Sequence, residues 1–274
     1  MLEKFKILSN GLKIPSIGFG TYKSGNDEET SEIIKNALNL GYKMIDTASF
    51  YNNEVGIGNG IKESGVNRDE IFLVTKLWND DHGYDNTIKA FNKSLENLQV
   101  DYIDLYLVHW PNKLNAETWK AFEYLYESGK IKAIGVCNFK IAHLEELKKS
   151  AKIMPMVNQV EIHPFSIKNE LIEYCNDNNI KVVAWSPISR GRVLCNDLMI
   201  DLSEKYKKSI VQIVLRWHMQ KGVIPIPKSS NINRIKENID IFDFEISDED
   251  MKAIDSLDEG YYESVTTPPA NTTY

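Results

Sequence analysis

Short apolar runs alternate along the chain with longer segments in which apolar residues recur at helical spacing. The runs are rich in Val, Ile and Leu and lack the strict alternation of half-exposed strands, so they predict parallel strands covered on both faces. Ile210, Ile213 and Trp217 illustrate the spacing of the segments between the runs, which predicts amphipathic helices. The predicted strands occupy residues 17–19, 44–46, 71–75, 104–108, 134–137, 157–160, 181–185 and 223–226.

Eight consecutive strand–helix units predict an α/β fold, the (β/α)8 TIM barrel, as a single domain over residues 1–274. Residues 5–7 and 13–14 flank Ser9-Asn10-Gly11, and Asn-Gly is a strong signal for a two-residue β-hairpin turn. We expect this hairpin to precede the barrel and to close its floor. An open doubly wound sheet is the structural alternative. It lacks support because no predicted strand is followed by a GxGxxG turn, so a nucleotide would have to bind in another way.

The composition argues against several kinds of partner. A formal net charge of −7 disfavours general binding to nucleic acids or anionic membranes, although a local basic cluster can still bind a phosphate group. No stretch approaches the roughly 18 consecutive apolar residues that span a bilayer, and the first residues lack the apolar region of a secretory signal. Cys137, Cys175 and Cys195 form neither a CxxC pair nor a disulfide framework. We therefore expect a soluble, cytoplasmic protein without a metal site.

Four polar residues end or closely follow three consecutive predicted strands. Asp46 ends the second strand, and Tyr51 follows five residues later. Lys76 follows the third strand and His109 the fourth. Each alone has an ordinary structural explanation, such as an Asp that caps a helix or a solvated Lys. Active groups of a barrel cluster at the carboxyl ends of its strands, so the shared position of the four predicts one catalytic rim.

These four groups together can reduce a carbonyl, which requires a hydride donor and an acid for the developing alkoxide. Tyr51 is the candidate general acid, but a tyrosine with the ordinary pKa of about 10 is a poor acid at neutral pH. A Lys76 ammonium would lower that pKa by stabilising the phenolate, and Asp46 would keep the buried ammonium charged. His109 would hydrogen-bond the substrate oxygen, orient it and share in proton transfer.

The motifs around these residues resemble the aldo-keto reductase superfamily over almost the full chain. They are GFGTY at residues 18–22, GYKMIDTASFYNNEVGIGNGI at 41–61, TKLW at 75–78, LVHWP at 107–111 and IPKS at 226–229. The resemblance places the family's catalytic tetrad on Asp46, Tyr51, Lys76 and His109. It also implies a (β/α)8 barrel, often monomeric, that binds NADPH in an extended conformation without a Rossmann domain.

The resemblance further implies the cofactor contacts. GVCNF and NQVE are similar to segments that grip the nicotinamide amide, and they indicate Asn138, Gln159 and, less directly, Cys137. A thiol is a weaker donor than the serine common at this position, so that contact is expected to be looser. AWSPI resembles AYSPL, whose aromatic ring stacks on the nicotinamide, and this role falls on Trp185. A buried strand cysteine and a core tryptophan are the structural alternatives for Cys137 and Trp185.

The segment IPKSSNINRIKENI follows the eighth predicted strand, where barrels commonly bind phosphate. Its cations and hydroxyls suit the adenosine 2′-phosphate that distinguishes NADPH from NADH, although a helix cap with solvated cations is the alternative. Residues 186–192 would form the loop over the pyrophosphate. The predicted cofactor-binding set is Gly20, Thr21, Asp46, Asn138, Gln159, Trp185, Ser186, Lys228, Ser229, Arg234, Glu237 and Asn238.

The predicted substrate pocket is aromatic, with Tyr22, Phe50, Trp78 and Trp110 beside the strand-end motifs. Family members that recognise steroids use a long C-terminal loop, whereas the tail after Leu257 is short and polar. It resembles the tails of microbial members that reduce methylglyoxal, 2,5-diketo-gluconate and other small carbonyls, although it could still fold over the mouth. The resemblance therefore implies NADPH-dependent reduction of small aldehydes and ketones to alcohols.

Two other functions remain as alternatives. A Schiff-base aldolase would use Lys76, but such a lysine needs a depressed pKa, which a neighbouring Asp46 opposes. An NADPH-responsive regulatory subunit would bind the cofactor tightly and turn over carbonyls slowly. Nothing in the sequence indicates an added interaction domain.

Overall fold

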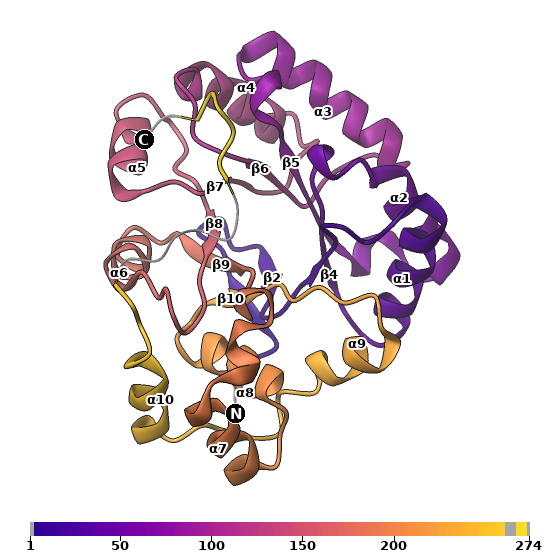
Figure 1. Cartoon of the computed structure of the whole chain (residues 1–274). Coiled ribbons are helices and arrows are strands. Elements are labelled where there is room, and N and C mark those ends of the chain that lie inside the picture. The colour runs from indigo at the N-terminus through magenta and orange to yellow at the C-terminus, as the bar shows by residue number, and fades with distance from the viewer. Residues whose placement is uncertain (1–2, 261–266, 273–274) are drawn as a thin grey trace.

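The centre of the molecule is a parallel sheet curled into a (β/α)8 barrel, which Figure 1 shows end-on in a computed structural model that describes residues 3–260 and 267–272. Each strand pairs with the next along the chain, so the alternative of an open doubly wound sheet is wrong. Two backbone hydrogen bonds of 3.0 Å join the ends of the sheet, from Gly18 N–H to the Pro225 carbonyl and from Gly20 N–H to the Pro227 carbonyl. The strands are β3 (Phe19–Gly20), β4 (Met44–Asp46), β5 (Phe72–Leu77), β6 (Leu105–Val108), β7 (Ile134–Cys137), β8 (Val157–Glu161), β9 (Lys181–Trp185) and β10 (Ile224–Pro225).

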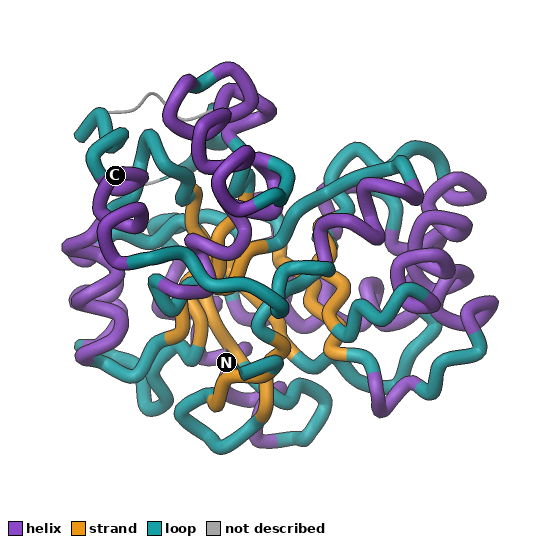
Figure 2. Tube along the Cα trace, turned by 90° about the horizontal axis from the view of Figure 1, so that it is seen from below, coloured by secondary structure: helices purple, strands orange, loops and turns teal. Residues whose placement is uncertain are grey.

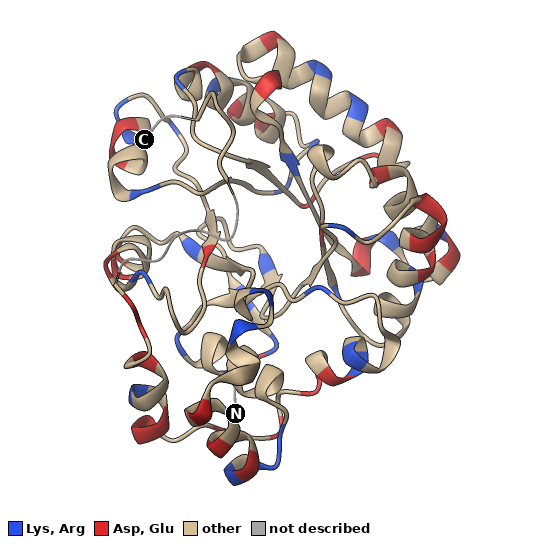
Figure 3. Cartoon of the chain, viewed as in Figure 1, with Lys and Arg blue, Asp and Glu red and all other residues tan. Residues whose placement is uncertain are grey.

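The α-helices lie outside the strands, as Figures 1 and 2 show. Most charged residues lie on these outer helices and on loops, with both signs intermixed (Figure 3). Within the described residues, no helix combines the length and the apolar character needed to cross a membrane. The helices are α1 (Asp27–Asn39), α2 (Glu54–Ser64), α3 (Tyr84–Leu98), α4 (Asn115–Glu127), α5 (Ile141–Lys148), α6 (Asn169–Asp177), α7 (Asp197–Tyr206), α8 (Ile210–Gln220), α9 (Ile232–Ile239) and α10 (Asp248–Asp255).

The predicted pattern of one helix after each strand does not hold for the last two strands. β9 is followed by α7 and α8, and β10 by α9 and α10. Lys207 separates α7 from α8 in a left-handed conformation (φ 52°), and the Ser209 side chain then caps α8. A short connection of this kind leaves no Gly or Pro signal in the sequence, so the pattern identified only the second helix of the pair.

The predicted N-terminal hairpin is present as β1 (Phe5–Ile7) and β2 (Lys13–Pro15), which pair antiparallel. Its turn is longer than the two residues that Asn-Gly predicts, because Leu8 N–H donates to the Leu12 carbonyl across a loop. The Asn10 side chain donates to the Lys132 carbonyl at 2.9 Å, just before β7 begins. This hydrogen bond connects the hairpin to the amino-terminal ends of the strands. Figure 2 shows the hairpin below the barrel. The hairpin therefore covers the floor.

One predicted strand end was wrong in a way that matters for the site. Residues 71–75 were predicted as the third strand, but β5 continues through Lys76 to Leu77. The sequence pattern ends a buried strand at a lysine because an ammonium ordinarily leaves the core. Here Lys76 is fully buried inside the strand, next to Asp46 at the end of β4.

Close packing of β7 against its neighbours depends on Gly135. A Cβ atom built on this residue would lie 2.6 Å from the Val157 carbonyl oxygen and 2.7 Å from Leu107 Cδ2. The Val157 contact is with backbone, so it cannot be relieved by a rotamer change. The absence of a side chain at Gly135 thus lets β6, β7 and β8 approach one another beneath the site.

We predict that Gly135→Ala lowers the free energy of unfolding by about 1–3 kcal/mol, because the strands must separate to admit the methyl group. Urea denaturation followed by circular dichroism measures this. An unchanged midpoint would mean that the strands move apart without cost and that the close approach is not required.

Candidate active site

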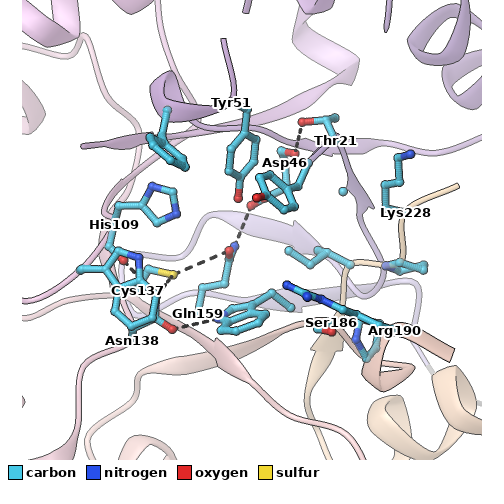
Figure 4. A pocket seen from close by; sticks show the side chains of 18 of the residues that line it. Thr21, Asp46, Tyr51, His109, Cys137, Asn138, Gln159, Ser186, Arg190 and Lys228 are labelled. Atoms are coloured by element: carbon cyan, nitrogen blue, oxygen red, sulfur yellow. Dashed lines mark hydrogen bonds between the residues drawn. The ribbon is translucent and has the colours of Figure 1, made fainter. Parts of the chain in front are cut away.

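A cavity of about 650 Å³ lies at the carboxyl ends of the strands, and most of the predicted site residues line it (Figure 4). Lys76 lies beneath it, buried, and is not part of the lining. Ser229, Arg234, Glu237 and Asn238 also lie outside it. The lining residues are Gly20, Thr21, Tyr22, Asp46, Phe50, Tyr51, Trp78, His109, Trp110, Cys137, Asn138, Gln159, Trp185, Ser186, Pro187, Ile188, Arg190, Ile226, Pro227, Lys228, Thr267 and Pro269.

The charged base of the site is the Asp46–Lys76 ion pair. Lys76 Nζ lies 2.5 Å from Asp46 Oδ1 and donates a second hydrogen bond of 2.8 Å to the Thr47 carbonyl. Burial is the largest single effect and acts to lower the pKa of Lys76, but the surrounding groups, Asp46 first among them, together raise it above the ordinary value for lysine. A buried, permanently charged ammonium is a poor nucleophile for a carbonyl, which argues against the Schiff-base alternative.

Tyr51 lies above this pair in the 3-10 helix Ser49–Tyr51, with Lys76 Nζ 5.1 Å from its ring centre. Burial raises the pKa of Tyr51 to about 12, although Lys76 acts in the opposite direction. The effect of Lys76 has the predicted sign, but the prediction of a lowered pKa is wrong for the protein alone, because burial dominates. The hydroxyl is therefore fully protonated near neutral pH and is available as a proton donor.

His109 faces the same space as Tyr51, directly after β6 (Figure 4). The two rings are nearly perpendicular, with their centres 5.8 Å apart. Burial and the nearby Lys76 ammonium lower the pKa of His109 well below its ordinary value, so the imidazole is neutral. A neutral imidazole has one N–H donor and one acceptor, which suits it to hold a substrate oxygen.

Two amide side chains form the opposite wall, in a chain of hydrogen bonds that reaches Asp46. Gln159 Nε2 donates to Asp46 Oδ2 at 2.7 Å. Cys137 Sγ lies 3.9 Å from Gln159 Oε1 and accepts from Asn138 Nδ2 at 3.3 Å. Trp185 Nε1 donates to Asn138 Oδ1 at 2.9 Å. Cys137 is thus both a buried strand residue and a member of the cavity wall.

Aromatic side chains form the wall nearest to His109. Phe50 and Trp78 stack with their ring centres 3.8 Å apart, and Trp78 meets His109 edge-on at 5.2 Å. Tyr22 lies 5.0 Å from the ring of Tyr51. The four aromatic residues of the predicted substrate set, Trp110 included, therefore surround one space.

The C-terminal tail also contributes to this wall. The sequence had not decided whether the tail folds over the mouth of the barrel. Thr267 and Pro269 line the cavity, and Asn271 Nδ2 donates to the Asn79 carbonyl at 3.4 Å in the loop after β5. Residues 261–266 and 273–274 of the tail lie outside the described part of the chain. No signal in the sequence fixes the path of residues 267–272, because these contacts are few and lie far apart along the chain.

The predicted phosphate end begins at Lys228, whose side chain lines the cavity and donates to Ser230 Oγ at 2.8 Å. The Asn231 side chain caps α9 by accepting from the backbone N–H groups of Asn233 and Arg234. Arg234 is exposed in the first turn of α9. The cations thus extend from the cavity to the surface. Among the described residues, no group of three His, Cys, Asp or Glu side chains could hold a metal ion.

The barrel places a neutral tyrosine and a neutral histidine at one cavity with a buried ammonium beneath it, an arrangement of groups that suits an oxidoreductase acting on carbonyls. Comparison with known proteins agrees. The profile of the Aldo/keto reductase family matches residues 16–259, and the chain belongs to this family. It is 53% identical over 253 residues to a protein named glyoxal reductase from Bacillus subtilis (strain 168), with 92% of each chain covered.

Two similar solved structures were determined with a nucleotide. A Bombyx mori aldo-keto reductase in complex with NADP has a TM-score of 0.90 and 35% identity, covering 96% of this chain and 95% of that one. An aspartate-to-alanine mutant of Gox0644 in complex with NADPH has a TM-score of 0.90 and 39% identity, covering 96% and 97%.

We predict that the His109 imidazole is neutral at neutral pH and stays so as the pH falls through the ordinary histidine midpoint near 6.5, because its pKa is lowered well below that value. Nitrogen-15 NMR of the five histidines, with His109→Gln to identify the resonance, measures this. A His109 midpoint at or above 6.5 would contradict the electrostatic effect of burial and Lys76.

Proposed function

We propose that the chain reduces small aldehydes and ketones to alcohols, with NADPH as the hydride donor and Tyr51 as the general acid. The observation that carries this proposal is the protonated Tyr51 hydroxyl, which faces the cavity above the Asp46–Lys76 pair and beside a neutral His109. Proton donor, charge stabiliser and oxygen-binding group thus meet at one point.

The residues fit an extended dinucleotide. The Trp185 ring and the Asn138 and Gln159 amides offer an apolar face and polar edges to a nicotinamide at the base of the cavity. Ser186 and Arg190 follow along the wall, and Lys228 leads out toward the start of α9. When bound there, NADPH supplies the hydride for the carbonyl carbon.

The residues of the chain supply the proton and the positioning. His109 holds the carbonyl oxygen by a hydrogen bond and directs it toward Tyr51. As the oxygen gains negative charge, Tyr51 transfers its proton to it, and the product is the alcohol. The resulting phenolate lies beside the Lys76 ammonium, which Asp46 keeps protonated. Lys76 therefore interacts more strongly with the state after proton transfer than with neutral Tyr51.

The substrate class follows from the walls. Tyr22, the Phe50–Trp78 stack and Trp110, with Pro269 of the tail, leave an apolar space beside His109. A small carbonyl compound of the kind that glyoxal reductase is named for fits this space, as expected for the microbial small-carbonyl reductases. We propose methylglyoxal and simple aromatic aldehydes as representative substrates.

The direct test is the rate of NADPH oxidation with methylglyoxal and with benzaldehyde, with NADH in parallel. Carbonyl-dependent turnover with NADPH supports the reductase. Tight NADPH binding without turnover favours the regulatory alternative, and the absence of both contradicts the proposal.

We predict that Tyr51→Phe lowers kcat by about a hundredfold to ten-thousandfold, because the variant keeps the ring but lacks the transferred proton. The dissociation constant for NADPH, measured by fluorescence titration, should stay within about twofold of the wild-type value. Tyr42→Phe is the matched control, since the Tyr42 hydroxyl is also buried but bonds to the Ile235 carbonyl away from the cavity. Loss of NADPH binding in Tyr51→Phe would contradict the general-acid role.

We predict that Lys228→Met and Arg234→Met each weaken NADPH binding about tenfold, the effect of losing one charge-assisted contact to the 2′-phosphate. NADH binding should be unchanged, because NADH lacks that phosphate. Lys236→Met on the exposed side of α9 serves as the control for a general loss of positive charge. Equal effects on both cofactors would show that these cations do not discriminate between them.

A further inference from the structure

The Trp185 indole makes a hydrogen bond that a stacking role does not require. Its Nε1–H donates to Asn138 Oδ1 at 2.9 Å, so the ring edge is engaged while the ring lines the cavity. Trp185 is the last residue of β9, and Asn138 directly follows β7. The bond therefore connects two strands that are not neighbours in the sheet, since β8 lies between them.

Asn138 is itself the junction between two strand ends. Its Nδ2 donates to the His109 carbonyl at 3.0 Å, and its backbone N–H donates to the Gln159 carbonyl at 2.9 Å. The residue adopts a left-handed conformation (φ 63°), which Asn tolerates better than most residues. Asn138 thus holds the main chain of His109 from one side, and Leu77 holds it from the other by accepting from His109 N–H.

The orientation of the Asn138 amide follows from these partners. A carbonyl oxygen only accepts hydrogen bonds and an indole N–H only donates. The Asn138 nitrogen must therefore face His109, and its oxygen must face Trp185. A flipped amide would place two oxygens together at His109 and two donors together at Trp185. The indole N–H is the side-chain donor that the structure gives to Asn138 Oδ1, so its removal leaves the orientation to the bonds of the amide nitrogen.

We propose that Trp185 is a positioning residue, whose indole N–H orients the Asn138 amide and thereby steadies the main chain that carries His109. This role is separate from packing against the nicotinamide, and it rests on the proposed function only in that hydride transfer to a carbonyl reports it. The ring face serves cofactor affinity, and the N–H serves the rate of the chemical step through Asn138 and His109.

The experiment uses Trp185→Phe, which keeps an aromatic face but has no N–H. We expect kcat with methylglyoxal to fall about tenfold and NADPH binding to weaken by a clearly smaller factor, since the aromatic face remains and the lost bond lies at the ring edge. The deuterium isotope effect on kcat with [4-²H]NADPH should rise, because hydride transfer becomes the slow step. Trp185→Ala should weaken NADPH binding as well.

Trp119→Phe is the matched control. Trp119 is buried and donates an indole hydrogen bond of the same length, 2.9 Å, to the Ile153 carbonyl far from the cavity. Its loss should lower the melting temperature without changing kcat or the isotope effect. The double variant Trp185→Phe with Asn138→Ala tests whether Trp185 acts through Asn138. If it does, the loss of the indole N–H causes no further loss of kcat once the Asn138 amide is gone.

Each outcome decides one question. Wild-type kinetics in Trp185→Phe, or an additive loss in the double variant, would overturn the positioning role. A parallel loss of NADPH binding and kcat in Trp185→Phe would do the same and leave packing as the only role of the ring. Absence of turnover in the wild-type enzyme would count against the proposed function instead. Circular dichroism of every variant identifies a loss of fold, and in that case Trp185→Leu, which also lacks a hydrogen-bond donor, replaces Trp185→Phe in the kcat comparison with Asn138→Ala.

Discussion

The buried ion pair between Asp46 and Lys76 is the interaction on which the rest of the site depends. Breaking such a pair by removing one partner costs about 3–5 kcal/mol, because the remaining charge is left in the interior without compensation. The pairing of β4 with β5 sets Asp46 opposite Val74, two residues before Lys76, and the lysine side chain reaches the carboxylate from there. Thr47 and Gln159 complete the hydrogen bonds of the two charged groups. The charged groups at the base of the site are therefore held by side chains from three strands of the barrel, β4, β5 and β8.

Burial and the Lys76 ammonium together set the pKa values of the two neighbouring residues, Tyr51 and His109. Burial raises the pKa of Tyr51 to about 12 despite the ammonium, and burial together with the ammonium lowers the pKa of His109. Both residues are consequently neutral at rest, which suits the proton-donating and oxygen-binding roles proposed for them. In the proposed reaction, the Lys76 ammonium is not needed to ionise Tyr51 beforehand. It would interact most strongly with Tyr51 after the proton has left, and such a differential interaction lowers a reaction barrier.

Much of this arrangement could be predicted from the sequence, and the failures have physical causes. The apolar runs predicted the bounds of β4, β7 and β9 correctly, because these strands are largely buried and each is followed directly by a polar residue. β5 was ended too early because a charged Lys76 belongs to the core only when Asp46 accompanies it, and pairing between strands is invisible to a local pattern. The direction in which Lys76 shifts the pKa of Tyr51 was predicted correctly. Whether this effect exceeds that of burial depends on how Tyr51 packs in the folded barrel, which the sequence pattern does not contain.

In the candidate site, too, the residues at strand ends could be predicted from the sequence, and those placed by distant contacts could not. Side chains at strand ends were brought to one cavity as the barrel rule requires, whereas the contribution of Pro269 depends on a tail contact made through Asn271 to Asn79. Such a contact joins segments nearly two hundred residues apart (|i−j| = 192) and has no periodic signature. Residues at the surface of α9, such as Arg234, remain predictions, because a phosphate contact is made only when a ligand is present.

The hydrogen bonds of the cavity share one direction, and the Cys137 thiol takes part in the series as both acceptor and donor. Trp185 donates to Asn138, Asn138 donates to Cys137, Cys137 donates to Gln159, and Gln159 donates to Asp46. Every donor in the series points toward the carboxylate, which can only accept. Burial raises the pKa of the Cys137 thiol, so it keeps the proton that this direction requires. The Asp46 carboxylate orients the Gln159 amide, and the Trp185 indole orients the Asn138 amide. The thiol lies between these two amides, so a weak donor at Cys137 is sufficient to continue the series of hydrogen bonds.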